Sequence, residues 1–123
     1  MNKTPAEIRA ELDFQFYEGQ TYPARPGKDA VLMTSGVVKM MELCHAGWLV
    51  EKIVQAQFSE PHKSELFQVW KLVVRPDHSA QLLSDDGNGK IISQEEISRT
   101  DFPLSEGISL FLTNGVIMLP SEY

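Results

Sequence analysis

The sequence predicts an α+β fold, with N-terminal helices packed on one face of a four- to five-stranded antiparallel meander sheet. Apolar residues recur at helical spacing in the first half of the chain, up to about Phe58. From Leu66 the apolar pattern changes to a period of two, which is typical of strands. Because the helices precede a run of short strands, the order indicates segregated layers within one α+β domain covering residues 1–123.

The first helix is predicted to begin at Pro5. Thr4 can cap it, proline suits the first helical position, and Glu7 completes a capping box. Its apolar stripe falls on Ile8, Leu12 and Phe16. The segment Phe14–Tyr17 stays open between helix and strand, because its aromatic residues also suit a strand.

A second helical region is predicted to begin after a cap at Thr34 or Ser35. One of its faces carries Val37, Met40, Met41, Cys44 and Trp48. The region is either one helix kinked at Gly47 or two helices that meet there, and we favour a break because glycine commonly follows a helix end. The apolar run Ala30–Met33 before it is open between strand and loop.

The second half of the chain reads as a strand meander. Residues 66–74 carry apolar side chains on both faces, which favours a central strand. Further strands are predicted over Ser79–Ser84 and Lys90–Ile97. Two more, Ile108–Thr113 and Val116–Leu119, flank Asn114-Gly115, a pair that supplies the positive φ angles of a two-residue hairpin turn.

Composition favours a cytoplasmic protein, and we expect no cofactor. The 123 residues include one cysteine, which suits a reducing compartment. The N-terminus lacks the apolar segment of a secretory signal, and no apolar run approaches the ~20 residues of a membrane span. The net charge of -6 opposes binding to nucleic acid or anionic lipid, which needs clustered Lys and Arg. We therefore expect no nucleic acid and no membrane partner.

One segment has the ligand spacing of a calcium-binding EF-hand loop. Oxygen-bearing residues fall at positions 1, 3, 5 and 12 of that motif, and glycine falls at position 6: Ser84, Asp86, Asn88, Glu95 and Gly89. Serine at position 1 and a strand where the motif has an entering helix both oppose it. We favour an acidic hairpin turn and keep calcium binding through Ser84–Glu95 as an alternative function, with Asp86, Asn88 and Glu95 as the candidate ligands.

The histidines and the cysteine raise a second alternative, a small cysteine-dependent enzyme using Cys44. His45 is adjacent to Cys44, but neighbours on a helix do not face each other, and Cys44 falls on the apolar stripe. Pairing with His62 or His78 stays open. Both follow or lie near prolines in predicted turns, where exposed histidine is usual, and no pair has zinc-ligand spacing. No catalytic residue is therefore assigned.

Four residues are candidates for an interaction surface. Trp48 and Trp70 would be the strongest partner anchors if exposed, although tryptophan is more often part of the core. Arg25 and Lys28 lie in a basic loop with a minimal PxxP pattern, which a proline-recognising domain or an anion could contact. The strand Val116–Leu119 could pair with another chain if it lies at a sheet edge.

Several segments together resemble a family of small bacterial and phage-associated α+β proteins with no assigned function. The segments are Leu32–Val37, Gly47–Leu49, Phe67–Leu72, Asp86–Gly89, Thr100–Leu104 and the ending LTNGVIMLPSEY, Leu112–Tyr123. The resemblance implies a single α+β domain and no catalytic residues. Our leading expectation is a non-enzymatic protein-interaction or accessory domain that acts through a protein partner or as a homo-oligomer.

Overall fold

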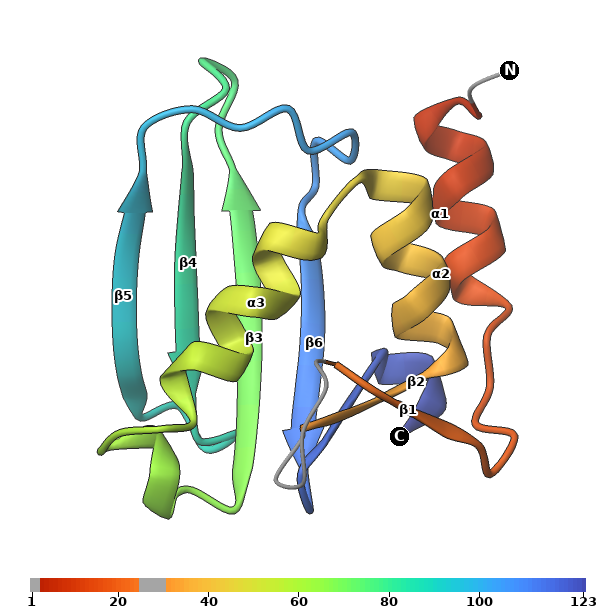
Figure 1. The fold of residues 1–123 in the computed structure, drawn as a ribbon. Helices are drawn as coiled ribbons and strands as arrows, with labels where there is room; N and C mark the ends of the chain where they lie inside the picture. Colours follow the sequence, from red (N-terminus) through yellow and green to blue (C-terminus); the bar gives the residue numbers. More distant parts are fainter. Residues whose placement is uncertain (1–2, 25–30) are drawn as a thin grey trace.

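The computed structural model describes residues 3–24 and 31–123, and within them the chain folds into helices on one side and a sheet on the other (Figure 1). The helices are α1 (Pro5–Asp13), α2 (Ser35–Cys44) and α3 (Gly47–Ala56), with short 3-10 helices η1 (His62–Ser64) and η2 (Pro120–Glu122). The strands are β1 (Thr21–Pro23), β2 (Leu32–Thr34), β3 (Phe67–Val74), β4 (Ala80–Asp85), β5 (Ile91–Ile97), β6 (Ile108–Thr113) and β7 (Val116–Met118).

The predicted α+β class is confirmed, but the predicted number of strands and the purely antiparallel sheet are wrong. Seven strands lie in the order β1-β2-β7-β6-β3-β4-β5, and β2 pairs with β7 in parallel. The additional strands β1 and β2 have three residues each. A strand of three residues is too short to show a periodic pattern, and its pairing with β7 depends on contacts between distant parts of the chain.

The first helix begins as predicted and ends early. Thr4 and Glu7 form the capping box, with Oγ1 of Thr4 accepting from the Glu7 amide and the Thr4 amide donating to Glu7 Oε1. Because α1 ends at Asp13, Phe16 lies off the packed face and is 66% exposed, so its predicted place on the apolar stripe is wrong. Phe14–Tyr17 adopts neither helix nor strand.

The predicted break between two helices is confirmed. Helix α2 ends at Cys44, and His45 then takes the left-handed conformation with φ 52°. Its amide donates to the Met41 carbonyl, and α3 begins at Gly47. The turn thus depends on His45, whereas the sequence pattern places the helix end at Gly47.

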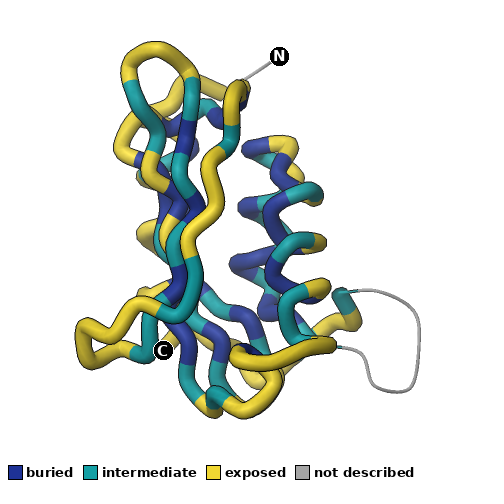
Figure 2. The backbone as a smooth tube through the Cα atoms, turned by 90° about the vertical axis from the view of Figure 1, so that its left-hand side faces the viewer, coloured by how far each residue is buried: buried dark blue, intermediate teal, exposed yellow. Residues whose placement is uncertain are grey.

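The core lies between the helices and the inner face of the sheet. Figure 2 shows the two layers from the β5 side, with buried residues where they face each other. Alternation along β3 places Trp70 and Leu72 on this inner face, against Met40 of α2 and Ile53 of α3 in one core cluster. In the described part of the chain, no α-helix lies over the other face of β3, β4 and β5 (Figures 1 and 2), while α1 and η2 flank that face beside β6.

Strand β3 is central, as predicted, with β6 and β4 on its two sides. The β6–β7 hairpin also forms as predicted, with φ 52° at Asn114 and 76° at Gly115. Strand β7 lies between β6 and β2, so Val116–Met118 is not a sheet edge and cannot extend the sheet with another chain. The two edges are β1 and β5.

The buried carboxyl group of Glu122 joins the C-terminus to the start of α2. Its Oε1 accepts from the hydroxyl of Thr34 at 2.6 Å and from the amide of Leu119 at 2.9 Å, and its Oε2 accepts from the amide of Gly36 at 3.1 Å. A Cβ atom at Gly36 would lie 2.5 Å from Oε1, so only glycine allows this approach. The free N–H groups of a helix start favour such an acceptor.

We expect Glu122→Ala to lower the free energy of unfolding by about 3 kcal/mol, because three buried donors lose their acceptor. Urea denaturation measures the change. Ser121→Ala is the matched control, since the neighbouring serine is exposed. It should change stability by less than about 0.5 kcal/mol. Equal stability of the two variants would contradict a structural role for the carboxyl group.

Candidate functional site

Two polar residues lie on the apolar inner face of the sheet. Gln68 precedes Trp70 and Leu72 on β3, and Ser84 follows Leu82 on β4. Both are completely buried. A buried polar side chain requires hydrogen-bond partners, so these two positions mark where a polar network crosses the core.

Gln68 fixes the turn that precedes β3. Its Nε2 donates to the carbonyl oxygens of His62 at 3.0 Å and Glu65 at 3.1 Å. Its Oε1 accepts from the indole N–H of Trp70 at 2.9 Å, and its amide exchanges two hydrogen bonds with that of Gln57 at the end of α3. The turn containing η1 is thereby held against the inner face of the sheet.

His62 is buried as a result, and the expectation that it is exposed in a turn is wrong. It is 7% exposed, and its ring stacks on that of Trp70 with centroids 4.9 Å apart. Its Nε2 lies 2.8 Å from Oγ of Ser84 and 3.3 Å from Oγ of Ser93, and the two hydroxyls are 2.7 Å apart. Ser84 and Ser93 face each other across β4 and β5, which brings the two hydroxyls together.

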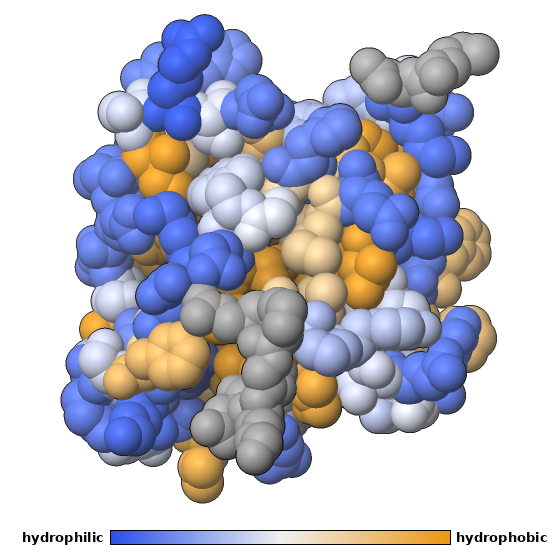
Figure 3. Space-filling view, viewed as in Figure 1, coloured by the Kyte–Doolittle hydropathy of each residue, from blue (hydrophilic) through white to orange (hydrophobic). Residues whose placement is uncertain are grey.

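A pocket of about 550 Å³ opens beside this group, between α3 and the β5 edge of the sheet. We call it the His62 pocket. His62, Trp70 and Ser93 line it, and Lys52 of α3 and Glu95 of β5 form an ion pair of 2.6 Å at its mouth. Figure 3 shows that hydrophilic residues predominate on this side of the helix-bearing face.

Burial lowers the pKa of His62 below its ordinary value of 6.5, and the Glu65 carboxylate offsets part of this effect. The ring is therefore neutral at neutral pH, and Nε2 either accepts or donates a hydrogen bond, depending on the tautomer. The two hydroxyls reorient to match. Ser93 ends this series of hydrogen bonds at the pocket, so its hydroxyl can present a hydrogen-bond donor or acceptor to a ligand.

The geometry suits hydrogen-bond recognition better than nucleophilic catalysis. Ser84 lies at a good distance from His62 but is completely buried, so no substrate reaches it. Ser93 borders the pocket, but its Oγ lies 3.3 Å from His62 Nε2. A nucleophile and its base are usually roughly 2.6–3.2 Å apart.

A second pocket, of about 360 Å³, lies near Arg9 of α1 and Glu106. Two of its charged side chains, Arg9 and Glu106, bond to each other. Arg9 Nε is 2.9 Å from Glu106 Oε2, and its Nη2 donates to the carbonyl of Gly107 at 2.8 Å. The guanidinium thus ties α1 to the segment before β6, which is a structural role.

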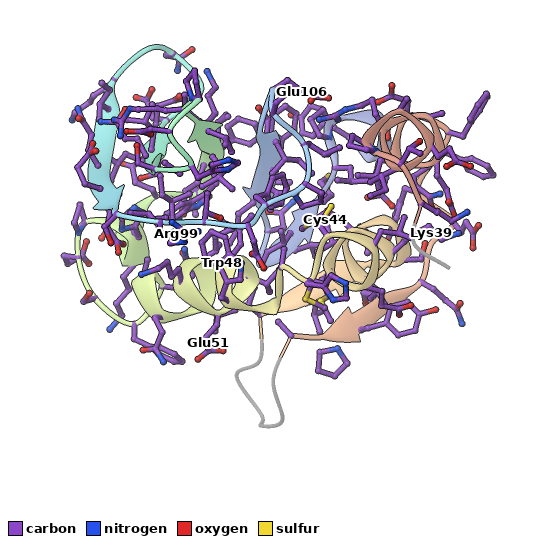
Figure 4. All side chains as sticks on the ribbon, turned by 90° about the horizontal axis from the view of Figure 1, so that it is seen from above. Lys39, Cys44, Trp48, Glu51, Arg99 and Glu106 are labelled. Atoms are coloured by element: carbon purple, nitrogen blue, oxygen red, sulfur yellow. The ribbon has the colours of Figure 1, made fainter. Side chains whose placement is uncertain are left out.

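Of the four predicted interaction residues, the structure describes Trp48 and Trp70, and neither is fully exposed. Trp70 is buried in the core, where it is part of the His62 pocket wall. Trp48 is half-buried and packs against the core cluster, on the sheet side of α3 in Figure 4. Arg25 and Lys28 lie outside the described residues.

Cys44 lies in the interior between α2 and the sheet (Figure 4) and is 1% exposed. Burial raises the pKa of its thiol to about 11, and the charge of Arg9 offsets part of this effect. The group is therefore a protonated thiol at neutral pH, which is a poor nucleophile.

The acidic segment 85–90 forms the tip of the β4–β5 hairpin. Oδ1 of Asp86 accepts from the amides of Asn88 and Lys90, at 2.8 and 3.2 Å. Glu95 pairs with Leu82 along β5, four residues beyond the start of that strand and so roughly 13 Å from it. Among the described residues, no group of three or more His, Cys, Asp or Glu side chains could hold a metal ion.

The uncovered face of the sheet carries an aromatic patch that sequence patterns did not indicate. It consists of Phe67, Phe111 and Tyr123, with ring centroids 5.3–5.6 Å apart in all three pairs. Phe67 of β3 and Phe111 of β6 come from neighbouring strands, and Tyr123 reaches them from the C-terminus. A strand pattern places two of these residues on one face, but only the folded C-terminus adds the third.

We expect the NMR titration midpoint of the His62 ring to lie below 6.5, because burial disfavours its charged form. The unfolded chain then binds more protons than the folded chain between the two pKa values. Stability should therefore fall as the pH drops from 6.5 through the folded pKa. His62→Gln should lack this part of the pH dependence in urea denaturation. A midpoint above 6.5 would contradict the buried, neutral ring.

We expect Cys44 to resist an aromatic disulfide reagent in native buffer at pH 8, because its thiol is buried and protonated. In concentrated urea the reagent should modify one thiol per chain, and this reaction controls for the quality of the reagent. Stoichiometric reaction of the folded protein, with its circular dichroism spectrum unchanged, would favour the cysteine-nucleophile alternative.

None of the helices in the described ranges combines the length and the apolar character needed to cross a membrane. Neither the comparison with curated proteins nor that with solved structures finds a match. The model of a family of unknown function, DUF6876, matches residues 6–123. The match covers nearly the whole chain, so the protein belongs to this family.

Proposed function

We propose that this chain is a non-enzymatic interaction domain that forms a homodimer through the aromatic patch. The observation that carries the proposal is the contact of three aromatic rings on a sheet face that no described α-helix covers over β3, β4 and β5. Aromatic residues are enriched at the centres of protein interfaces, and an apolar patch with a polar border is typical of them.

The patch extends beyond its three rings. The register places Phe111 beside Met118 of β7, which is partly exposed, and beside Val69 of β3, which is buried beneath the rings. Tyr123 is 72% exposed, which leaves most of its ring available to a partner. A tyrosine of this exposure combines a large apolar area with a polar hydroxyl, as interface anchors often do.

Contacts on two sides of the patch restrict its residues before any partner binds. The β4–β5 turn closes over Phe67, because a Cβ atom at Gly87 would lie 2.8 Å from the Phe67 ring. Gly87 also has φ 85°, which L side chains rarely adopt. On the other side, Glu122 anchors the residue before Tyr123. Side chains that are already ordered lose little entropy on association.

The charges beside the patch suit a two-fold symmetric contact. Lys71 Nζ and Asp85 Oδ2 lie 3.8 Å apart on the same sheet face, so both signs of charge are present there. In a two-fold dimer each residue of one copy can meet its counterpart on the other. Two copies can therefore exchange these ion pairs, which limits the repulsion expected between chains of net charge -6.

We expect sedimentation velocity to show a concentration-dependent dimer at micromolar protein, because the patch buries its rings on association. Tyr123→Asp should weaken the dimer by at least ~10-fold, or ~1.4 kcal/mol, since it places a charge at the centre of the contact. Tyr17→Asp is the matched control, because Tyr17 is exposed and lies in the link between α1 and β1. It should leave the dimer unchanged.

A monomer at every accessible concentration would overturn the homodimer. A dimer that Tyr123→Asp leaves intact would place the contact elsewhere and would equally overturn the proposal. Circular dichroism of both variants controls for folding. Because both tyrosines are exposed, we expect each substitution to cost little stability.

A further inference from the structure

We propose that the His62 pocket binds a small uncharged molecule that joins one hydrogen-bonding group to a flat apolar body. Trp70 lines the pocket and Phe67 belongs to the aromatic patch, and since the two are three residues apart on β3 their side chains point to opposite faces of the sheet. The inference is therefore independent of the proposed dimer.

The polar end of the pocket is a built hydrogen-bonding group. His62, Ser84 and Ser93 are linked by three contacts of 2.7–3.3 Å, and of the two serines only Ser93 lines the pocket. When His62 Nε2 carries the proton, it donates to Ser84, Ser84 donates to Ser93, and the Ser93 hydroxyl donates toward the pocket. In the other tautomer these bonds reverse, and Ser93 offers an oxygen lone pair to the pocket. An amide or a hydroxyl on a ligand can satisfy either arrangement.

The charges around the pocket disfavour an anion. Lys52 on α3 is the cation at the mouth, and it is already paired with Glu95 of β5 at 2.6 Å. Glu51, also on α3, adds a negative charge to the lining, on the side of the helix turned away from the sheet in Figure 4. The remaining titratable group, His62, is held neutral by burial. A ligand anion would therefore be desolvated without a free cation to receive it.

A cation is also disfavoured at the polar end. The carboxylate of Glu95 is engaged with Lys52, so a cationic ligand would have to displace that lysine from a short ion pair. The other carboxylate of the lining, Glu51, lies on the side of α3 turned away from the sheet (Figure 4), and so not at the polar end of the pocket. The neutral ring of His62 and the hydroxyl of Ser93 offer it hydrogen bonds but no charge. The ligand that costs least to desolvate here is uncharged.

The walls and the size define the rest of the ligand. Trp70, Leu82 and Ala56 form the apolar part of the lining. The volume of about 550 Å³ lies within the range of roughly 300–1,000 Å³ that small-molecule sites occupy. A single aromatic ring with one polar substituent fits both the volume and the division into a polar end and apolar walls.

Three probes of nearly the same shape test the inference: benzamide, benzoate and benzamidinium. They share a phenyl ring and a planar substituent, and they differ in charge. We expect benzamide at millimolar concentration to shift the backbone amide of Ser93 and the indole N–H of Trp70 in ¹H–¹⁵N spectra. Benzoate and benzamidinium should bind at least ~10-fold more weakly, because each brings an uncompensated charge.

Ser93→Ala removes the pocket end of the hydroxyl chain and should weaken benzamide binding by ~10-fold, the usual cost of a lost hydrogen bond. Ser98→Ala is the matched control, since Ser98 is exposed just beyond β5. It should bind benzamide as the parent chain does. Tyr123→Asp should also leave benzamide binding unchanged, so the test stays separate from that of the dimer.

The inference is overturned by any of three results. These are the absence of benzamide shifts at the pocket, equal binding of all three probes, and unchanged binding by Ser93→Ala. Spectra of each variant without probe establish that it is folded. If benzoate binds best, the pocket is an anion site, and the argument from the paired Lys52 is wrong.

Discussion

The carboxyl group of Glu122 is the contact on which the arrangement of the C-terminal half depends. It accepts hydrogen bonds from the end of β2, the first turn of α2 and the residue after β7. Thr34 and Gly36 lie more than eighty residues before Glu122 in the chain, and the same region contains the parallel β2–β7 pair. Because the carboxyl group satisfies donors from all three segments, it sets the position of α2 over the sheet and leaves Tyr123 beside the aromatic patch.

Gln68 has the corresponding role on the other side of the sheet. One amide satisfies two backbone carbonyls, the Trp70 indole and Gln57, and so holds the turn that carries His62. The His62 pocket and the aromatic patch thus each depend on a buried polar side chain, Gln68 and Glu122 respectively, in addition to apolar packing. Buried polar groups contribute little net stability, but they require one arrangement of their partners, since an unpaired group is costly. This favours a fixed pocket and a fixed patch.

Local signals in the sequence were sufficient for much of the fold. The cap at Thr4, the hairpin at Asn114-Gly115 and the two-sided apolar pattern of β3 each depend on neighbouring residues, and each is confirmed. The parallel β2–β7 pair and the burial of His62 depend on distant contacts, so no local pattern revealed them. One signal was available for the pocket, because Gln68 and Ser84 are polar residues on stripes that are otherwise apolar.

Strand β3 links the two surfaces and also keeps them separate. Successive side chains of a strand point to opposite faces, so Phe67 and Val69 face the uncovered side while Gln68 and Trp70 face the pocket. A register slip of one residue would exchange these sets and destroy both surfaces together. In the correct register, the sheet backbone lies between them: Ser93 contacts Ser84 and His62, whereas Tyr123 contacts Phe67 and Phe111. Substitutions at the two sites should therefore act independently, which is the condition for reading pocket and patch as separate functions of one small domain.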